Sequence, residues 1–335
     1  MNERKTVREI AEIAGVSIAT VSRVSRGIGQ VSPETRRRVL ETIEAHGYRA
    51  SHLSRALAER RHGALGLVFP GLSGPYYAEL IQGFESQAVE SRTSVHIVCT
   101  HLRRDTDEQV LEMAHRVDGI AVLGGTVSDE ALRRLAASVP VVVIAGEAPA
   151  GLPSVTVDNR DATRALTGHL IDAHHLTSLA FVGTPAGSPD VTERWHGFRD
   201  AHRLAGITPP RSTVRVAMQQ HDGVAAMDRM AESGQLPEAA VCANDELALG
   251  VLVGALARGI TVPDQLAITG FDGVPMADLV SPTLTTVHQP IRELAATAAR
   301  TLLDAGAGHP VPVRPVVLPT RLALQGSCGC DPPGS

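Results

Sequence analysis

Hydrophobic positions at the start of the chain recur every three or four residues, which is the spacing of one face of an α-helix. The first such run consists of Val7, Ile10, Ala11 and Ala14. The segment Thr6-Val7-Arg8-Glu9 has the T-x-x-E form of a capping box, so the helix is expected to begin directly after Thr6. Gly15 follows the run and can take the left-handed conformation that ends a helix. The pattern predicts a helix over residues 7–14 and a sharp turn after it.

Two further short helices are predicted before residue 50. Ser17 is a suitable N-cap for a helix over residues 18–24. Ser32-Pro33 is a second start signal, and Gly47 is expected to end that helix after about residue 46. The predicted buried positions of these two helices are Val21, Val24, Val39, Leu40 and Ile43. Two short helices joined by a three-residue turn, followed by a third helix, are the arrangement of a helix-turn-helix.

Beyond residue 63 the pattern changes, and short apolar runs alternate with helical stretches. The apolar runs form two series, residues 64–70, 94–100, 118–124 and 139–145, then residues 178–183, 239–244 and 266–272. Helices are expected between them, over residues 77–91, 160–173, 190–205, 245–258 and 290–305. Continuous Val, Ile and Leu runs that alternate with helices predict an α/β fold with two doubly wound, parallel-sheet lobes. Because ligands bind at the carboxyl ends of such strands, the cleft between the lobes is the expected ligand site.

Charge is distributed unevenly between these two parts of the chain, whose overall formal charge is −5. Residues 1–62 contain 12 basic and 7 acidic residues, whereas residues 63–335 contain 19 basic and 29 acidic residues. The head is therefore close to +5 and the body close to −10. A basic head predicts a polyanionic partner for the head alone. The alternative is a small helical bundle whose basic residues only face solvent.

In a helix-turn-helix the second helix lies in the major groove of DNA. The residues that this helix would present are Ser17, Ile18, Ala19, Thr20, Ser22 and Arg23. Arg23 is the expected base reader, because a guanidinium can bond to O6 and N7 of guanine together. Ile18 and Ala19 cannot hydrogen-bond but can pack against thymine methyl groups. The three arginines at positions 36–38 are expected near phosphates, where they add affinity without sequence information.

Several protein classes are disfavoured by what the sequence lacks. It has neither a signal-peptide core nor an apolar run near the roughly 20 residues that span a bilayer, so we expect a cytoplasmic protein without membrane contact. No G-x-G-x-x-G follows the first predicted strand, and G-K-[ST], G-x-S-x-G and H-E-x-x-H are absent. We therefore expect no catalytic site, no cofactor and no metal site. Cys99 and Cys242 are expected to be reduced core residues, and Cys328 and Cys330 to lie in a solvated tail.

Residues 6–27, TVREIAEIAGVSIATVSRVSRG, closely resemble the opening of the lactose-repressor (LacI) family. The stretch AGVS-x-x-TVSRV carries the resemblance, together with VSPETR at residues 31–36 and GYRASHLSRAL at residues 47–57. The resemblance implies a homodimer on a near-palindromic operator. The sequence departs from the family pattern at the end of the head, where Ser25-Arg26 replaces the usual Leu-Asn and Ala50 replaces a common Pro.

The same resemblance implies a hinge helix that contacts the minor groove. Its Leu57, beside Ser54, would wedge between base pairs and kink the duplex, and a buried linker leucine is the alternative. The remaining DNA contacts that the resemblance implies are Thr6, Ser32, Thr35 and Tyr48. The implied divisions are a DNA-binding head over residues 1–49, a hinge and linker over 50–62, an effector-binding domain over 63–327 and a tail over 328–335.

The body resembles the family's effector-binding domain, which is itself similar to periplasmic sugar-binding proteins. The matching segments PYYAELIQGFE, ERWHGF, CANDELALG, TGFDGV and TTVHQP imply effector contacts by Tyr76, Tyr77, Arg194, Asn244, Asp272 and Gln289. Aromatic faces suit sugar C–H groups or a purine ring. The alternatives are that the tyrosines belong to the core and that Asp245 caps the following helix. Ala145, where the family commonly has Asp, and Met218, where it often has an aromatic residue, leave the effector open.

The resemblance implies an N-lobe of about residues 63–160 plus 290–320 and a C-lobe of about 161–289 plus 321–327. The implied function is a DNA-binding transcriptional regulator, a repressor of a carbohydrate-metabolism operon controlled by a sugar-type effector between the lobes. A purine- or nucleoside-dependent corepressor system is an alternative, and a solute-binding protein or an enzyme with the same body is more remote. Effector and DNA would favour different conformations, and the sequence is compatible with induction and with corepression.

Overall fold

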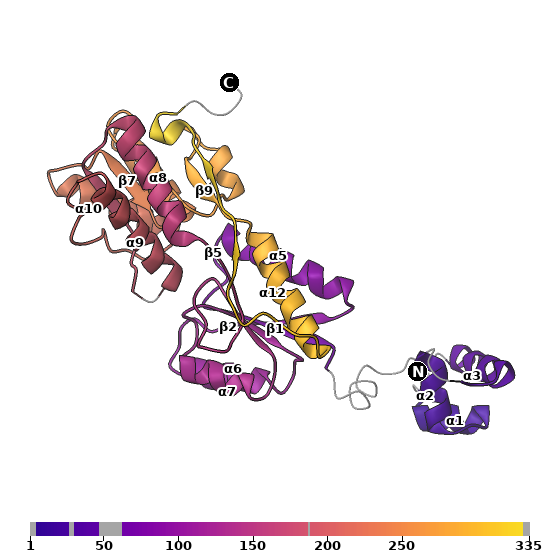
Figure 1. Ribbon diagram of the computed structural model, residues 1–335. Helices are drawn as coiled ribbons and strands as arrows, with labels where there is room; N and C mark the ends of the chain where they lie inside the picture. Colours follow the sequence, from indigo (N-terminus) through magenta and orange to yellow (C-terminus); the bar gives the residue numbers. More distant parts are fainter. Residues whose placement is uncertain (1–4, 27–29, 47–61, 187, 331–335) are drawn as a thin grey trace. The chain divides into compact units, whose positions relative to one another are not determined.

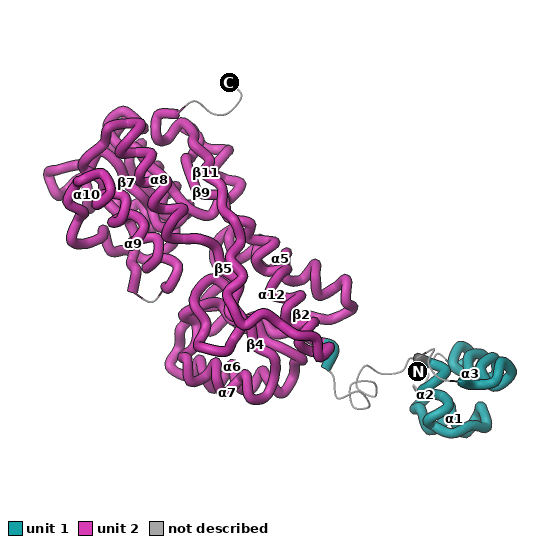
Figure 2. The backbone as a smooth tube through the Cα atoms, viewed as in Figure 1, with its two compact units in different colours: residues 1–63 teal, residues 64–335 magenta. Residues whose placement is uncertain are grey.

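The computed structural model describes residues 5–26, 30–46, 62–186 and 188–330. The chain forms two compact units, Met1–Gly63 and Ala64–Ser335 (Figure 2). Across the described segments, no helix is both long enough and apolar enough to cross a membrane.

The described residues of the first unit form three helices, α1 (Val7–Ala14), α2 (Ile18–Arg26) and α3 (Pro33–Ala45). The capping box that begins α1 is as predicted, because the Glu9 amide donates to the Thr6 hydroxyl (3.4 Å) and the Thr6 amide donates to the Glu9 carboxylate (2.6 Å). Hydrogen bonds from the Thr6 amide and hydroxyl lower the pKa of Glu9 to about 2. Gly15 ends α1 with φ +63°, a backbone conformation that glycine adopts without strain.

The core of this unit is small and aliphatic. It is formed by Ile10, Ala11, Ala14, Val21, Val24 and Val39. The prediction that Leu40 is buried is wrong, because its side chain is 47% exposed. Val39 and Ile43 are four residues apart and share one face of α3, whereas the residue after Val39 is turned by about 100° around the helix.

The N-lobe of the second unit, where Figure 1 labels β1, β2 and β5, contains a six-stranded parallel sheet in the order β10-β5-β4-β3-β1-β2. The strands are β1 (Ala64–Phe69), β2 (Ser94–Cys99), β3 (Ile120–Leu123), β4 (Val141–Ile144), β5 (Ser154–Val157) and β10 (Val316–Leu318). One face of the sheet packs against α5 (Pro75–Glu90) and α12 (Ile291–Gly306). The other face packs against α6 (Thr106–Met113) and α7 (Asp129–Ala136). Both faces are thus covered, as continuous apolar strands require.

The C-lobe contains a three-stranded parallel sheet in the order β6-β7-β8. Its strands are β6 (Leu179–Val182), β7 (Ala239–Cys242) and β8 (Ala267–Thr269), and its helices are α8 (Asn159–His174), α9 (Pro189–Leu204), α10 (Gln220–Glu232) and α11 (Asp245–Ala257). An antiparallel pair, β9 (Thr286–His288) with β11 (Arg321–Ala323), and two short 3-10 helices, η1 (Pro275–Asp278) and η2 (Gly326–Cys328), complete this lobe. The predicted fold class, a helix-turn-helix head followed by parallel-sheet α/β lobes, is confirmed.

Helices α8 and α9 pack as a close pair at one side of the C-lobe. A Cβ atom added to Gly197 of α9 would collide with the carbonyl oxygen of Arg160 on α8. This contact fixes the separation of the two helices, because only glycine leaves room for the backbone of the neighbouring helix. It therefore also fixes the position of the α9 side chains relative to those at the start of α8.

The chain passes between the lobes three times. These passages are the segments from β5 to α8, from β9 to α12, and from β10 to β11. Residues on the passages and at the adjacent ends of the parallel strands therefore lie at the junction of the lobes, where the strand arrangement predicts a ligand site.

Candidate functional site

The outer face of α2 has the properties expected of a DNA-reading surface. Val21 and Val24 are buried against the head core. Ile18 is 44% exposed, and Ala19 and Arg23 are exposed as well. The helix therefore has one apolar face inside the bundle and presents a mixed apolar and cationic face, which is the composition that contacts base edges.

Several predicted DNA contacts also form the helix caps of the head. The Ser17 hydroxyl accepts a hydrogen bond from the Thr20 amide (3.2 Å) and pairs with the Thr20 hydroxyl (2.9 Å). Ser32 caps α3 in the same way, through the amide of Thr35 (3.3 Å) and its hydroxyl (2.8 Å). Thr6 caps α1. These bonds fix helix N-termini, whose free amide groups favour phosphate.

The structure describes Ser25, one of the positions at the end of α2 where the sequence departs from the family pattern. The Ser25 hydroxyl donates to the carbonyl of Val21 within α2, so this family departure is accommodated by a bond along the helix. Tyr48, Ala50, Ser54 and Leu57 lie outside the described residues. Their predicted roles at the hinge remain predictions.

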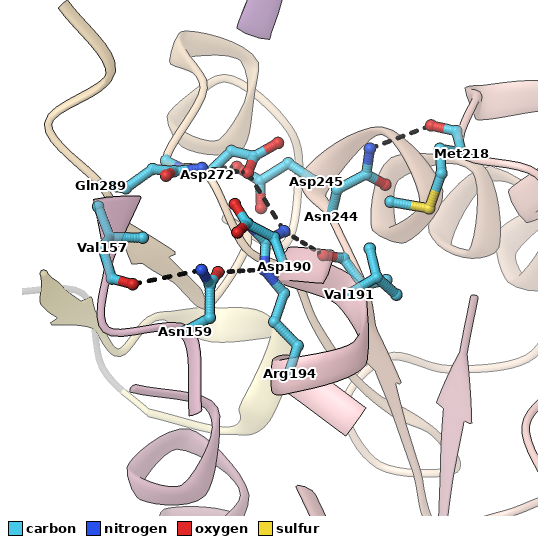
Figure 3. Close-up of polar contacts among 12 residues, drawn as sticks. Val157, Asn159, Asp190, Val191, Arg194, Met218, Asn244, Asp245, Asp272 and Gln289 are labelled. Atoms are coloured by element: carbon cyan, nitrogen blue, oxygen red, sulfur yellow. Dashed lines mark hydrogen bonds and ion pairs between the residues drawn. The ribbon is translucent and has the colours of Figure 1, made fainter. Parts of the chain in front are cut away.

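In the second unit, five polar side chains meet at the junction of the lobes (Figure 3). We call them the interlobe cluster, and they are Asn159, Asp190, Arg194, Asp272 and Gln289. Each of the five residues is at most 9% exposed. Three of them, Arg194, Asp272 and Gln289, are among the effector contacts predicted from the sequence.

Arg194, on α9, is the centre of the interlobe cluster. Its Nε donates to Asn159 Oδ1 (2.8 Å) and its Nη1 donates to the carbonyl of Ala243 (2.6 Å). Nη1 also lies 3.6 Å from Asp272 Oδ1, and Nη2 lies 3.9 Å from Asp190 Oδ2. The guanidinium is thus held by groups on several elements, which fixes its plane and leaves two carboxylates beside it.

Asp272 follows β8 and has an unusual backbone conformation. Its φ of +123° is one that residues with a side chain rarely adopt, and such strain concentrates at functional sites. Gln289, at the end of β9, donates from Nε2 to Asp272 Oδ1 (2.7 Å). Burial raises the pKa of the Asp272 carboxyl, whereas the charge of Arg194 and the Gln289 hydrogen bond oppose that shift.

Asp245 and Asn244 have structural roles beside this cluster. Asn244 is the N-cap of α11: its Oδ1 accepts from the Leu247 amide (3.0 Å), and its Nδ2 donates to the Met218 carbonyl (3.0 Å). The alternative that Asp245 is the cap is therefore wrong. Asp245 Oδ2 instead accepts from the amide groups of residues 273 and 274 (2.8 and 2.9 Å) and holds the loop after Asp272. An effector contact by Asn244 remains a prediction.

Tyr76 and Tyr77 lie at the start of α5 and bring the N-lobe to the cluster. Burial raises the pKa of Tyr76 well above its ordinary value, and the negative charges of Asp190 and Asp272 raise it further. The Tyr76 hydroxyl therefore lies in the electric field of both carboxylates. Tyr77 packs on Phe69 and Tyr76, with ring centroids 5.4 Å apart in each pair. Both tyrosines are half-buried, in keeping with either a ligand-facing or a core position.

Ala145 and Met218, the two departures from the family pattern in the effector-binding domain, pack among apolar residues. Ala145 is buried in the N-lobe core with φ +55°, and Met218 packs against the C-lobe core. A hollow of about 460 Å³ adjoins the cluster, and its lining is Glu79, Gly273, Pro275 and residues 289–293. The space next to Gln289 is therefore bordered by both lobes.

Two members of the interlobe cluster, Asp190 and Asn159, were not predicted from the sequence. Asp190 lies four residues before Arg194 on α9, so the acid–base spacing along one helix face was a detectable signal. Asn159 is 35 residues before Arg194 in the chain, and no local pattern pointed to it. Burial raises the pKa of Asp190, while the charge of Arg194 opposes the shift.

The C-terminal cysteines differ from their prediction. Cys328 is 2% exposed in the C-lobe core and Cys330 is half-buried beside it, so the expectation of a solvated tail is wrong for both. The segment is held because the amide of Ser327 donates to the carbonyl of Thr283 (2.9 Å). Cys242 is buried as predicted, whereas Cys99 is half-buried at the end of β2.

Comparison with known proteins places both units. The family described as "Bacterial regulatory proteins, lacI family" matches residues 6–51, and the family described as "Periplasmic binding protein-like domain" matches residues 167–328. Catabolite control protein A of Priestia megaterium is 34% identical over 328 residues, covering 96% of this chain and 98% of that protein. Catabolite control protein A of Staphylococcus aureus (strain Mu50 / ATCC 700699) is 30% identical over 329 residues, with the same coverage.

Solved structures agree with this assignment. The Lac repressor dimer bound to operator and the anti-inducer ONPF has a TM-score of 0.85 and 24% identity, covering 97% of this chain and 99% of that chain. The transcriptional regulator CelR–cellobiose complex has a TM-score of 0.70 and 28% identity, covering 97% and 100%. Transcription regulator CcpA of Lactococcus lactis has a TM-score of 0.71 and 26% identity, covering 79% and 98%. The chain belongs to the LacI family of bacterial regulatory proteins and is a DNA-binding transcriptional regulator.

Proposed function

We propose that the chain is a homodimeric repressor of carbohydrate-metabolism genes whose operator affinity is controlled by a neutral sugar bound between its two lobes. The observation that carries this proposal is the interlobe cluster, which places buried hydrogen-bonding groups where both lobes meet. The relatives named catabolite control protein A support the link to carbon metabolism.

The charge of the cluster favours a ligand that donates hydrogen bonds. Asp190 and Asp272 flank a single guanidinium, that of Arg194, so the cluster has two carboxyl groups for one cationic group. A polyhydroxyl ligand can donate to the free lone pairs of both carboxylates, and its apolar C–H faces can pack on Tyr76. A phosphorylated or carboxylated ligand would add negative charge beside these groups. The cellobiose in the CelR structure is an example of a neutral sugar in a related regulator.

On the DNA side, we propose that α2 of each subunit enters the major groove of one half of a near-palindromic operator. The exposed Arg23 reads a guanine, while Ile18 and Ala19 pack on neighbouring thymine methyl groups. The Lac repressor structure, a dimer on its operator, is the precedent for two heads on one site.

Control follows from a shift between conformations. The sugar and DNA each bind one arrangement of the lobes more tightly than the other. Each ligand weakens the binding of the other if they favour different arrangements and strengthens it if they favour the same one, by the same factor in both directions. Because Arg194 lies on α9 and Gln289 lies on a passage between the lobes, their contacts with a ligand are sensitive to the lobe arrangement.

The test is calorimetric titration of the full chain with a panel of neutral sugars, their phosphates and nucleosides. The proposal predicts binding by at least one neutral sugar and at least ten-fold weaker binding by its phosphate. Binding by a nucleoside with no response to any sugar would support the corepressor alternative instead. A phosphorylated sugar that binds more tightly than its neutral parent would contradict the charge argument.

A further inference from the structure

Four side chains of types that can ligate metals, two histidines and two cysteines, converge in the C-lobe from distant parts of the chain. His169 and His174 lie on α8, Cys328 ends η2, and Cys330 follows two residues later. Their ligand atoms all lie within 4.8 Å of one another. We call these residues the Cys–His cluster. It is formed by side chains other than those of the interlobe cluster.

Four separations within the Cys–His cluster are close to those of a tetrahedron around one ion. Zinc binds histidine nitrogen at about 2.0–2.1 Å and thiolate sulfur at about 2.3 Å, so ideal tetrahedral geometry separates two nitrogens by about 3.4 Å and nitrogen from sulfur by about 3.6 Å. The two Nε2 atoms are 3.1 Å apart. Cys330 Sγ lies 3.3 and 3.4 Å from the Nε2 atoms of His169 and His174, and Cys328 Sγ lies 3.9 Å from that of His169.

Hydrogen bonding alone does not account for this convergence. The Nε2 atom of His169 faces another ring nitrogen and two sulfur atoms. A ring nitrogen has either one hydrogen or one lone pair, so it can satisfy only one of those three contacts at a time. A cation at the centre satisfies all four groups together, with neutral imidazoles and thiolates as ligands.

The local structure is suited to hold the two sulfurs in place. Gly329, between the cysteines, has φ +94°, which turns the chain so that both neighbours can face α8. The buried Thr285 hydroxyl lies 3.0 Å from Cys328 Sγ and can donate to it. A hydrogen bond of this kind orients a metal ligand and stabilises the thiolate.

We propose that the Cys–His cluster is a structural zinc site that fastens the C-terminal end of the described chain to α8. Four protein ligands close the coordination sphere, as in structural rather than catalytic zinc sites. Two imidazole nitrogens and two thiolates also suit zinc better than magnesium or calcium, which prefer oxygen. The site joins the segment after β11 to α8, the helix that begins with Asn159. It therefore stabilises the helix whose first residue accepts a hydrogen bond from Arg194.

The test is metal analysis of the full chain purified without chelator. The proposal predicts one zinc ion per chain by mass spectrometry, lost in Cys328→Ser and Cys330→Ser. Cys99→Ser is the matched control, because this half-buried cysteine lies on β2 of the other lobe, and it should retain the ion. Cobalt loading should give the sulfur-to-metal absorption band and the intense visible bands of a tetrahedral site.

A second measurement covers variants that fail to fold. Zinc added to the chelator-treated parent should raise its melting temperature, because an ion that binds only the folded state stabilises it. Absence of zinc and of the cobalt bands from the folded parent would overturn the proposal. So would a disulfide between Cys328 and Cys330 in the protein isolated under reducing conditions, or zinc retained in both Cys328→Ser and Cys330→Ser.

Discussion

The Nη1 atom of Arg194 lies 3.6 Å from the Oδ1 atom of Asp272, and both side chains are buried where the two lobes meet. The arginine comes from α9 and the aspartate from the loop after β8. A buried charge pair costs more in desolvation than a surface pair, so its presence is better explained by ligand recognition than by stability. This pair is the basis of the first prediction.

Asp272→Asn should weaken effector binding by at least ten-fold, about 1.4 kcal/mol or more, because hydrogen bonds to a charged group are worth about 1.5–3 kcal/mol. Asparagine can still accept from Gln289, so the local packing is retained. Calorimetric titration of both proteins with the sugar that binds the parent measures the change. Asp264→Asn, at an exposed position, is the control. Equal affinities of Asp272→Asn and the parent would remove Asp272 from the site.

Arg23→Ala should reduce specific operator affinity and relax discrimination at one base pair by about 1–3 kcal/mol, the usual value of a bidentate contact to guanine. Arg37→Ala is the matched comparison, since it removes an exposed arginine from α3 rather than from the reading helix. It should weaken specific and non-specific DNA binding alike and lower the dependence on salt. Gel-shift titrations on operator and scrambled duplexes measure both effects. A variant at position 23 that discriminates as well as the parent refutes the base-reading role.

Gly197→Ala should lower the free energy of unfolding of the effector-binding unit by about 1–3 kcal/mol, the usual cost of overpacking. The added methyl group would collide with the carbonyl of Arg160 and separate α8 from α9. Gly168→Ala, on α8, is the control, because the nearest atom to its added methyl is 4.0 Å away. That change should instead stabilise the helix by up to about 1 kcal/mol. Urea unfolding followed by circular dichroism distinguishes the two, and equal effects would contradict the packing described.

Glu238 provides a test of pH dependence. Hydrogen bonds from the Ser178 and Thr177 amides (both 2.8 Å) lower the pKa of this carboxyl below its ordinary value of 4.5. A carboxyl with a depressed pKa stabilises the fold above its unfolded pKa, and that stability is lost as the pH falls through the folded pKa. Glu238→Gln should therefore be less stable than the parent at pH 7, and the difference should shrink below about pH 4.5. A difference that stays constant between pH 7 and pH 3 is the contrary result.

The helical elements were predictable where start signals were strong. Thr6 and Ser32 cap helices as expected, because hydroxyl caps followed by Glu or Pro satisfy local backbone groups. Apolar runs that alternate with helical stretches also predicted the parallel sheets, because such strands are covered by helices on both faces. Leu40 shows the limit of this approach: it is 47% exposed although Val39 before it is buried, because consecutive residues are turned by about 100° around a helix.

The candidate sites depended on contacts across the chain. Arg194, Asp272 and Gln289 were predicted only through family resemblance, and Asn159 was not predicted at all, because its partner is 35 residues away. The Cys–His cluster was missed for the same physical reason. Cys328 and His169 are 159 residues apart, and only the folding of the C-terminal segment onto α8 brings them together.

The most direct test of control by the interlobe cluster is the operator affinity of the full chain with and without its sugar. Fluorescence anisotropy on a near-palindromic duplex selected from random DNA measures this affinity at one salt concentration. Our account predicts at least a ten-fold change in the parent on saturation with the sugar, and a response in Asp272→Asn that requires at least ten-fold more sugar. An operator affinity in the parent that is identical with and without a sugar shown to bind between the lobes would contradict it.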